Sequence, residues 1–371
     1  MGRLAVNASI VDPVLSGLGV YTVNLIKELS EFQEDLIIYT SCPNAFAQDQ
    51  ARIRSISKPL GPTYGKCAHL RRLLWTQFIL PKSMARDKAT VLFSTIPEGV
   101  FGEAVPQYLV VHDVTPLKFR KEYSLQWWYF QLYVRSLLRR VKRIIAVSEQ
   151  TKADIMTSFG IPPSQIRVIP GGCRHESFHA NINPDSVKRK YHLNSYCLYV
   201  GNFHPHKNLF RLIQAFGALA KNACPQLVIV GNKDPRYFPG LQAMVERLGL
   251  NANVLFLGYV PQNDLPGLYA GAEVFILPSL YEGFGLPLVE AMACGVPVIA
   301  AKGGAMEAVV DKAGIMVDPT NINEMAEAMN QVLANPELRG TLCERGLRQA
   351  KNYSWSTTAK MVSQVLDESK S

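Results

Sequence analysis

Two glutamates that stand eight residues apart, Glu282 and Glu290, have the types and spacing best suited to chemistry. They lie in the segment Leu277-Pro-Ser-Leu-Tyr-Glu282-Gly-Phe-Gly-Leu-Pro-Leu-Val-Glu290-Ala-Met-Ala-Cys-Gly-Val-Pro. The apolar run before it predicts a buried strand, the glycines predict a turn, and a helix is expected from Leu286. Glu282 would lie on the turn and Glu290 about one turn inside the helix. Carboxylates accept hydrogen bonds from paired hydroxyls, so Glu290 suits a ribose and Glu282 a transferred hexose. Two solvated surface glutamates are the alternative.

The predicted helix start adds an anion-binding feature beside these carboxylates. The backbone N–H groups of Phe284, Gly285 and Leu286 would lie at a helix N-terminus. Unpaired donors and the helix dipole favour a phosphate or sugar hydroxyls there. These three residues are therefore predicted to bind the donor.

A lysine is the predicted cation of the site. It lies in the segment Tyr199-Val-Gly-Asn202-Phe-His-Pro-His206-Lys207-Asn208, which follows an expected strand and precedes an expected helix. At such a position Lys207 can meet diphosphate oxygens and stabilise the charge of a leaving nucleotide. An exposed lysine without a ligand is the alternative.

The segment around Glu282 and Glu290 resembles the signature of the family-4 retaining glycosyltransferases (glycosyltransferase group 1). These enzymes adopt the GT-B fold, in which two Rossmann-like domains face a central cleft. The resemblance covers nearly the whole chain and is strongest from Cys197 to Pro319. It implies that Glu282 contacts the donor sugar and that Glu290 holds the ribose.

The sequence departs from the family pattern beside Lys207. A basic pair usually neutralises the diphosphate, but Asn202 replaces the frequent arginine and His206 stands where Arg-Lys is usual. Lys207 is therefore the one expected cation. His206 is expected to be a weaker second donor or a cap for the following helix, and Asn202 and His206 are both placed at the donor site.

Two segments of the first half carry weaker signals. Gly17 and Gly19 follow an expected strand and would let the backbone approach a phosphate, although the third glycine of the dinucleotide fingerprint is missing at Thr22. His112 ends an expected strand, where it could hydrogen-bond the sugar at the reacting centre. The family resemblance supports both roles and implies that the backbone around Tyr259 reads the base. A plain turn and a packed core histidine are the alternatives.

Rival chemistries leave incomplete signatures. His175-Glu-Ser-Phe-His179 matches H-E-x-x-H, but nearby glycines and prolines disfavour the helix that zinc binding needs. No D-x-D triplet and no G-x-x-x-x-G-K-[ST] occurs, which disfavours a metal-chelating transferase and a P-loop enzyme. The sequence predicts no metal and no cofactor beyond the nucleotide sugar that is the substrate.

The composition suits a two-domain protein. The chain has 371 residues, of which 48% are hydrophobic and 19% charged, enough for two α/β cores. Seven cysteines without a CxxC pair favour reduced thiols in a cytosolic protein. No signal peptide is visible and no apolar stretch approaches the roughly 20 residues of a membrane span. A cytoplasmic protein is expected, either free or peripheral on the inner face of the membrane.

The formal charge of +9 is concentrated in two stretches, Leu70–Lys88 and Trp127–Arg143. No nucleic-acid-binding signature accompanies it, so no nucleic acid partner is expected. Aromatic and apolar side chains flanked by arginine could rest on anionic lipid; a basic solvated face over core aromatics is the alternative. The residues concerned are Trp75, Phe78 and Ile79, or Trp127, Trp128 and Tyr129, flanked by Arg71, Arg72, Arg139, Arg140 and Lys142.

Short apolar runs alternate with helical patterns, which favours parallel sheets covered on both faces. Strands are expected at Leu4–Ile10, Leu36–Tyr39, Val91–Ser94, Tyr108–His112, Ile144–Ser148 and Ile166–Ile169. In the second half they are expected at Cys197–Val200, Leu227–Val230, Val254–Leu257, Val274–Leu277, Val298–Ala301 and Ile315–Val317. Helices are expected at Tyr21–Ser30, Glu149–Phe159 with Ser148 as its N-cap, Leu209–Ala220, Leu286–Ala293, Ile322–Leu333 and Ser356–Asp367.

The Gly-, Pro- and Asn-rich stretch Pro170–Asp185 predicts a linker between two doubly wound domains. Residues 1–175 would form an N-terminal Rossmann-like acceptor-binding domain, and residues 176–355 a C-terminal nucleotide-sugar-binding domain. Residues 356–371 would form a terminal helix that could cross back to the first domain. Ligands are expected at the carboxyl ends of the strands.

The predicted function is a retaining, metal-independent hexosyltransferase. It would move a glucose- or mannose-type hexose to a glycan or lipid-linked acceptor in polysaccharide or glycolipid synthesis. The expected donor is a UDP-sugar, with a GDP-sugar as the second choice. Lys207 and the amides near Gly17 and Gly19 would hold the charge of the departing nucleotide. The departing phosphate would take the acceptor's proton, as is thought for the family. A sugar-nucleotide epimerase or phosphorylase on a similar frame, and a catalytically silent sugar-binding homologue, are the alternatives.

Overall fold

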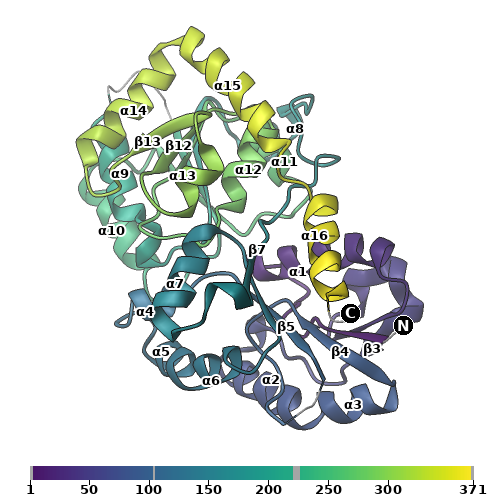
Figure 1. Cartoon of the computed structure of the whole chain (residues 1–371). Helices are drawn as coiled ribbons and strands as arrows, with labels where there is room; N and C mark the ends of the chain where they lie inside the picture. Colours follow the sequence, from purple (N-terminus) through teal and green to yellow (C-terminus); the bar gives the residue numbers. More distant parts are fainter. Residues whose placement is uncertain (1–2, 103–104, 220–225, 369–371) are drawn as a thin grey trace. The chain divides into compact units, whose positions relative to one another are not determined.

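The chain forms two α/β units, each built on a parallel sheet with flanking helices (Figure 1). The computed structural model describes residues 3–102, 105–219 and 226–368. Cys224 and the predicted helix end at Ala220 lie outside these ranges. The first unit comprises the chain up to Gly171 and again from Trp355 onward, and the second comprises Gly172–Ser354. The division therefore falls inside the predicted linker, slightly before residue 175, and the last helix belongs to the first unit.

The first unit contains a seven-stranded parallel sheet in the order β3-β2-β1-β4-β5-β6-β7. Six of these strands coincide with predicted strands to within a few residues at their ends. The edge strand β3 was not predicted, because it is short and only half buried and so lacks a long apolar run. The strands are β1 (Arg3–Asn7), β2 (Leu36–Thr40), β3 (Ile53–Ser55), β4 (Ala89–Ser94), β5 (Gln107–Val111), β6 (Arg143–Ala146) and β7 (Ile166–Val168).

The second unit contains a six-stranded parallel sheet in the order β10-β9-β8-β11-β12-β13. All six strands were predicted. They are β8 (Tyr196–Val200), β9 (Gln226–Val230), β10 (Val254–Gly258), β11 (Val274–Leu277), β12 (Val298–Ala301) and β13 (Gly314–Val317). Both sheets therefore confirm the predicted α/β class, with crossover connections that carry helices.

The helices of the first unit are α1 (Gly17–Phe32), α2 (Lys66–Phe78), α3 (Leu80–Arg86), α4 (Thr115–Lys118), α5 (Ser124–Trp128), α6 (Arg135–Leu138), α7 (Glu149–Phe159) and α16 (Trp355–Asp367). Segments of other helix types are η1 (Pro43–Arg52), η2 (Pro62–Tyr64), η3 (Tyr129–Val134) and η4 (Pro163–Gln165). Ser148 caps α7 as predicted: its Oγ accepts a hydrogen bond from the N–H of Thr151 at 3.0 Å.

The helices of the second unit are α8 (Asp185–Tyr191), α9 (Leu209–Gly217), α10 (Phe238–Arg247), α11 (Leu265–Ala270), α12 (Leu286–Ala293), α13 (Ala305–Val310), α14 (Ile322–Ala334) and α15 (Pro336–Ala350). One short turn, η5 (Pro205–Lys207), precedes α9. The predicted helix Leu286–Ala293 agrees with α12 at both ends, and Ile322–Leu333 differs from α14 by one residue.

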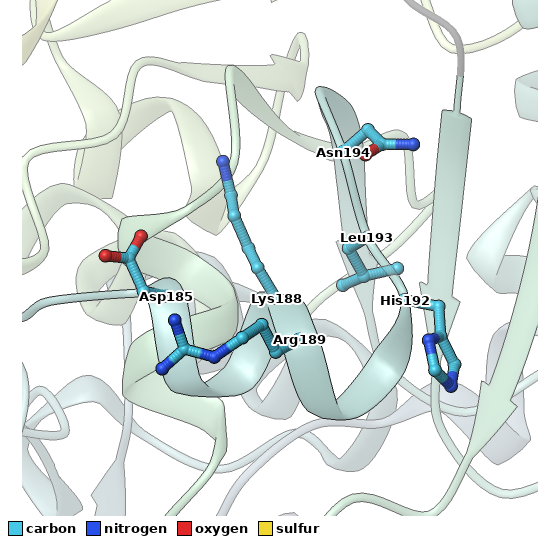
Figure 2. Close-up of a pocket in the computed structure, with 6 residues that line it drawn as sticks. All are labelled: Asp185, Lys188, Arg189, His192, Leu193 and Asn194. Atoms are coloured by element: carbon cyan, nitrogen blue, oxygen red, sulfur yellow. The ribbon is translucent and has the colours of Figure 1, made fainter.

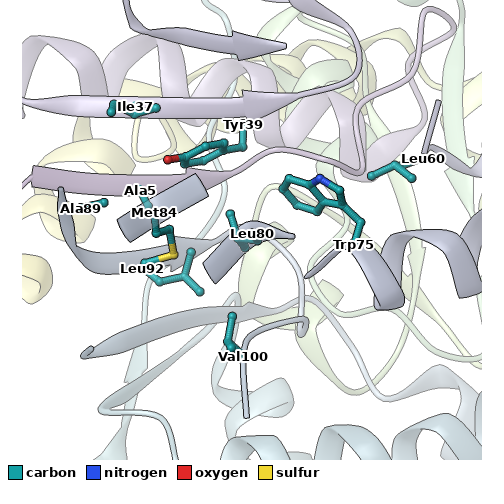
Figure 3. Close-up of a cluster of buried hydrophobic side chains, with 10 residues drawn as sticks. All are labelled: Ala5, Ile37, Tyr39, Leu60, Trp75, Leu80, Met84, Ala89, Leu92 and Val100. Atoms are coloured by element: carbon teal, nitrogen blue, oxygen red, sulfur yellow. The ribbon is translucent and has the colours of Figure 1, made fainter. Parts of the chain in front are cut away.

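Buried apolar side chains hold the first sheet against α2 and α3 (Figure 3). Trp75 of α2 is only 7% exposed and lies in this core with Tyr39 of β2, their ring centroids 6.4 Å apart. Of the two alternatives left open for Trp75, the lipid surface is therefore excluded and the core position is confirmed. Trp75 occupies a buried position of an amphipathic helix, and its aromatic type alone does not distinguish the two faces.

A buried ion pair also ties α2 to the loop after β4. Arg72 donates three hydrogen bonds to the Glu98 carboxylate: from Nε to Oε1 at 3.0 Å and to Oε2 at 2.9 Å, and from Nη2 to Oε1 at 2.7 Å. Arg72 also donates to the carbonyl oxygen of Leu60 at 3.0 Å. Both charged side chains are under 10% exposed. The prediction that Arg72 flanks a lipid-binding surface is thus wrong, because its guanidinium is committed inside the unit.

Removing one partner of this pair should destabilise the first unit strongly. Glu98→Gln is expected to lower the free energy of unfolding by about 3–5 kcal/mol, because a buried guanidinium loses its counter-charge. Tryptophan fluorescence in urea is a suitable measurement, because Trp75, Trp127, Trp128 and Trp355 all lie in the first unit.

The control is the double variant Arg72→Met/Glu98→Leu, which removes both charges together. It should regain most of the lost stability. If Glu98→Gln were as stable as the wild type, the ion pair would contribute nothing to the free energy of unfolding.

Candidate functional site

Lys207 and Glu282 form an ion pair in the second unit, with Nζ 2.6 Å from Oε1. Lys207 ends η5 after β8, and Glu282 lies in the turn after β11, the neighbouring strand of the sheet. The Oγ of Ser279 donates to the same carboxylate oxygen at 2.7 Å. Both charged side chains are 14% exposed. Lys207 and Glu282, which lie in separate segments of the sequence, are therefore in contact at the carboxyl ends of the strands of one sheet.

A left-handed asparagine holds the two segments together. Asn208 is 3% exposed and adopts a φ of +64°. Its side-chain Nδ2 donates to the carbonyl oxygens of Pro278 at 3.0 Å and Pro319 at 2.6 Å. Sequence reasoning gave this residue no role. Its type was the available signal, because asparagine tolerates the left-handed region better than most residues.

The helix start beside Glu282 has the form that was predicted. Gly285 precedes α12 with a φ of +102°, which a side chain would strain, and a Cβ there would lie 3.1 Å from the Leu288 side chain. No side chain caps this N-terminus. Phe284 is buried and Leu286 begins the helix. The first N–H groups of α12 are thus not satisfied by a side-chain cap.

Glu290 lies one turn further into α12 and has a different environment from Glu282. The hydroxyl of Tyr269 donates to its Oε2 at 3.0 Å. Desolvation raises the pKa of the Glu290 carboxyl to about 7, against smaller lowering effects of Tyr269 and of the Arg174 guanidinium. Sequence reasoning did not identify Tyr269 or Arg174 as neighbours, because they come from α11 and from the segment before α8.

His206 was expected to be either a weaker second donor at the donor site or a cap for α9. It is 5% exposed, and burial together with the adjacent charge of Lys207 lowers its pKa to about 3. It is therefore neutral at physiological pH. The cap alternative is wrong, because Asn208 occupies that position, whereas the alternative of a weaker second donor stays a prediction. The backbone oxygen of His206 instead accepts the N–H of Leu280 at 2.7 Å, which is a second link between the two segments.

Asn202 and Tyr259 are exposed residues at strand ends of the second unit. The Asn202 Oδ1 accepts the N–H of His204 at 3.2 Å, so this side chain organises its own turn. Tyr259 is 51% exposed and follows Gly258, whose φ is +74°. Their predicted contacts with the donor remain predictions.

Gly17 and Gly19 lie in the first turn of α1, since this helix begins at Gly17 and not at the predicted Tyr21. A Cβ at Gly17 would have no neighbour within 4 Å, whereas one at Gly19 would lie 3.2 Å from the Leu15 side chain. The two glycines therefore belong to the helix start and not to a loop before it. Ser16 precedes it without a side-chain capping bond.

His112 lies just after β5 in the first unit, as predicted for a strand end. Its Nε2 lies 2.8 Å from the carbonyl oxygen of Thr95, which can only accept, so Nε2 carries a proton. Desolvation lowers the pKa of the ring. The neutral form therefore has an unprotonated Nδ1 that can accept a hydrogen bond.

The H-E-x-x-H match has the non-helical structure that was expected. His175 and His179 lie in a segment of turns, and the His175 Nε2 lies 3.0 Å from the carbonyl oxygen of Tyr353. Among the described residues, no group of three or more His, Cys, Asp or Glu side chains could hold a metal ion. The six cysteines in the described ranges are free thiols.

A cavity of about 470 Å³ lies elsewhere on the second unit, along α8 (Figure 2). It is lined by Asp185, Lys188, Arg189, His192, Leu193 and Asn194. None of the predicted site residues contributes to it. The cavity is open to solvent. Because it lies away from the predicted site residues, its volume does not identify the functional site of this chain.

Two family matches cover most of the chain. Residues 185–349 match Glycosyl transferases group 1, and residues 15–177 match Glycosyltransferase Family 4. The chain belongs to the group 1 glycosyltransferases. This membership makes it a sugar-transferring enzyme and confirms the family predicted from the segment around Glu282 and Glu290.

The chain is similar to several curated glycosyltransferases. It is 34% identical over 237 residues to O-antigen chain mannosyltransferase B of Escherichia coli, a match that covers 61% of each chain. It is 25% identical over 375 residues to O-antigen chain mannosyltransferase RfbU of Salmonella typhimurium, covering 99% of this chain and 100% of the relative.

Similar solved structures confirm the GT-B fold. Sucrose-phosphate synthase of Thermosynechococcus elongatus has a TM-score of 0.80 at 21% identity and covers 99% of both chains. WaaG, a glycosyltransferase involved in lipopolysaccharide biosynthesis, has a TM-score of 0.76 at 18% identity over 98% of this chain and 99% of that chain.

The raised pKa of Glu290 makes the stability of this glycosyltransferase depend on pH. The folded pKa of about 7 exceeds the ordinary value of 4.5, so folding favours the protonated carboxyl. Stability is fully present below about pH 4.5 and falls as pH rises through 7, by up to about 3 kcal/mol. Calorimetry between pH 5 and 8 on wild type and Glu290→Gln should show this loss in the wild type alone.

Glu327→Gln, at an exposed position of α14, is the matched control and should follow the wild type at every pH. A Glu290→Gln profile parallel to that of the wild type would contradict the burial of this carboxyl.

Proposed function

We propose that this glycosyltransferase transfers a hexose from a UDP- or GDP-sugar to a hydroxyl of a glycan or lipid-linked acceptor, with retention of the anomeric configuration and without a metal ion. The observation that carries the proposal is the Lys207–Glu282 pair at the uncapped start of α12. It combines a cation for a diphosphate, an acceptor for sugar hydroxyls and free backbone donors within one turn.

The sugar and the process are proposed from the named relatives. O-antigen chain mannosyltransferases B and RfbU build O-antigen chains according to their names, and an MMP α-(1→4)-mannosyltransferase of Mycolicibacterium hassiacum matches 95% of this chain at 25% identity. These names favour mannose over glucose as the hexose. They also favour polysaccharide synthesis as the process that uses it.

The donor would be held by residues of the second unit. Lys207 would turn from Glu282 to the diphosphate oxygens, which frees the Glu282 carboxylate for hydroxyls of the hexose. Glu290 would accept the ribose hydroxyls, and the N–H groups of Phe284, Gly285 and Leu286 would meet phosphate or sugar oxygens. The backbone around Tyr259 would read the base, and Asn202 and His206 would shape the turn that carries Lys207.

The transfer needs no covalent intermediate on the protein. The bond from the sugar C1 to the diphosphate oxygen breaks, and the acceptor oxygen bonds to C1 on the same face. The departing phosphate takes the acceptor's proton. Lys207 stabilises the charge that develops on the leaving group, and His112 accepts a hydrogen bond from the sugar at its unprotonated Nδ1. The helix start at Gly17 and Gly19 would add backbone donors for the phosphate.

An anionic membrane surface is the proposed site of the lipid-linked acceptor. Leu70, Leu74 and Phe78 recur on one face of α2 and are 60%, 50% and 65% exposed. Leu125, Trp128 and Leu132 form a similar stripe along α5 and η3 and are 78%, 53% and 65% exposed. Exposed basic side chains, including Arg71 and Arg86, accompany the first stripe. No helix in the described residues is long and apolar enough to cross a membrane.

Donor binding tests the site directly. Calorimetric titration of UDP, GDP, UDP-glucose and GDP-mannose without metal should show binding of one nucleotide series to the wild type. Lys207→Met should weaken it by about 10- to 100-fold, because charge-assisted hydrogen bonds contribute about 1.5–3 kcal/mol. Glu290→Ala should weaken it as well.

Lys302→Met is the matched control, because Lys302 also pairs with a glutamate at 2.6 Å but is 55% exposed. It should bind as the wild type does. Absence of binding for every nucleotide would favour a silent homologue, and turnover of the donor without any acceptor would favour an epimerase.

Flotation with vesicles that contain anionic lipid tests the membrane surface. The wild type should float at low salt and lose binding near 1 M salt, where the Debye length falls to about 3 Å. Leu74→Glu should abolish flotation, because it places a charge in the apolar stripe. Phe210→Glu, which changes a 40% exposed apolar residue of α9 in the second unit, should leave it intact. A wild type that stays unbound at low salt would remove the membrane part of the proposal.

A further inference from the structure

Three aromatic rings form a column inside the first unit. Tyr21 of α1 lies edge-on to the imidazole of His112, with ring centroids 4.5 Å apart and an interplanar angle of 89°. On its other side Tyr21 lies edge-on to the indole of Trp355, at 5.2 Å and 82°. Tyr21 is 1% and Trp355 is 4% exposed. Edge-to-face packing of this kind has a preferred geometry, so each ring restricts the orientation of the next.

The hydroxyl of Tyr21 makes no interaction that would account for a tyrosine at this position. It is buried and has no hydrogen-bond partner among the described residues. Burial raises the pKa of this phenol far above its ordinary value. A phenol that neither donates nor ionises contributes through the shape of its ring. The ring fills the space between the imidazole and the indole.

Trp355 brings the last helix of the chain into this column. It is the first residue of α16, which is fastened to the first unit along its whole length. Near its start, Thr358 donates to the carbonyl oxygen of Pro170 at 2.9 Å. Further along, Gln33, which follows the end of α1, donates to the Ser363 Oγ at 2.7 Å, and after the end of α16 Arg143 donates to Glu368 at 3.2 Å. The Trp355 indole therefore has a fixed position against the Tyr21 ring.

Packing against the His112 ring matters because a single hydrogen bond orients this imidazole. The bond from Nε2 to the Thr95 oxygen places the proton on Nε2 only while the ring keeps the orientation that this bond needs. Without packing against the ring, the imidazole would tilt out of this bond, and both the direction of Nδ1 and the preference for the Nε2–H tautomer would be lost. Thr22, one residue after Tyr21, binds the Thr95 side chain at 2.8 Å and so ties α1 to the same strand end.

We propose that Tyr21 and Trp355 are positioning residues that hold the His112 imidazole in its reactive orientation, so that the terminal helix α16 is part of the transfer machinery. The functional half of this inference rests on the proposed role of His112 in transfer. The structural half concerns the orientation and tautomer of the ring and stands without that role.

The test compares Tyr21→Leu and Trp355→Leu with Tyr21→Phe. Both leucine variants should lower kcat of hexosyl transfer at least tenfold, while the dissociation constant of the nucleotide stays within twofold, because the residues proposed to hold the base, the ribose and most of the diphosphate lie in the second unit. Tyr21→Phe keeps the ring and should restore kcat to near the wild-type value. Histidine ¹⁵N shifts should show the His112 Nε2–H tautomer in the wild type and in Tyr21→Phe, and tautomer averaging in both leucine variants.

Trp75→Leu is the control for simple loss of stability. Trp75 is a buried aromatic of the same unit, within the core cluster of Figure 3 and away from His112. This variant should be destabilised to a similar extent, yet keep kcat and the His112 signal of the wild type. If the leucine variants at Tyr21 and Trp355 behave like Trp75→Leu, the positioning role is overturned.

A further variant separates this inference from the proposed function. His112→Ala with unchanged kcat would refute the role of His112 in transfer. In that case the tautomer signal still decides whether the column orients the ring. Unchanged His112 shifts in Tyr21→Leu would refute the positioning role even where His112 proves essential.

Discussion

The pairing of Lys207 with Glu282 is the interaction on which the rest of the site depends. Each side chain is largely buried and would be costly without a counter-charge. Their residues come from turns after two adjacent parallel strands, so the sheet fixes the separation of the two turns. Asn208 and the backbone of His206 bind the second turn to the first. The ion pair is therefore a consequence of strand order and not of any local sequence pattern.

The two glutamates of the signature are made different by their surroundings. Glu282 has a lysine at 2.6 Å and a serine hydroxyl at 2.7 Å, both of which favour the carboxylate. Glu290 has a tyrosine hydroxyl and a more apolar setting, and its pKa is raised to about 7. Glu290 therefore exchanges its proton in the physiological range, whereas Glu282 is paired with a cation. A ligand that donates hydroxyl hydrogens to Glu290 draws it toward the carboxylate.

The sequence predicted the sheets well because strands buried on both faces leave continuous apolar runs, as in Val274–Leu277 and Val298–Ala301. It predicted the turn and helix around Glu282 because glycine and proline punctuate that segment. It did not identify Asn208, Tyr269 or Trp355 as neighbours of site residues, since each acts through a contact between distant segments. It left Trp75 open between a lipid surface and the core, and His206 open between a second donor and a cap, because a residue type shows what a side chain could do whereas burial decides what it does.

The neutral His206 has an electrostatic consequence for the donor. A histidine with a pKa of about 3 adds no charge, and the Lys207–Glu282 pair has no net charge of its own. In the proposed binding mode, a diphosphate that arrives with about two negative charges would be met by a lysine that must leave its partner. The start of α12 would contribute roughly another half of a positive charge. The hexose hydroxyls would then compensate Glu282 as Lys207 turns away, so sugar and diphosphate would bind best together. Coupling of this kind favours an intact nucleotide sugar over the nucleotide product, and it follows from the same ion pair that the strand order creates.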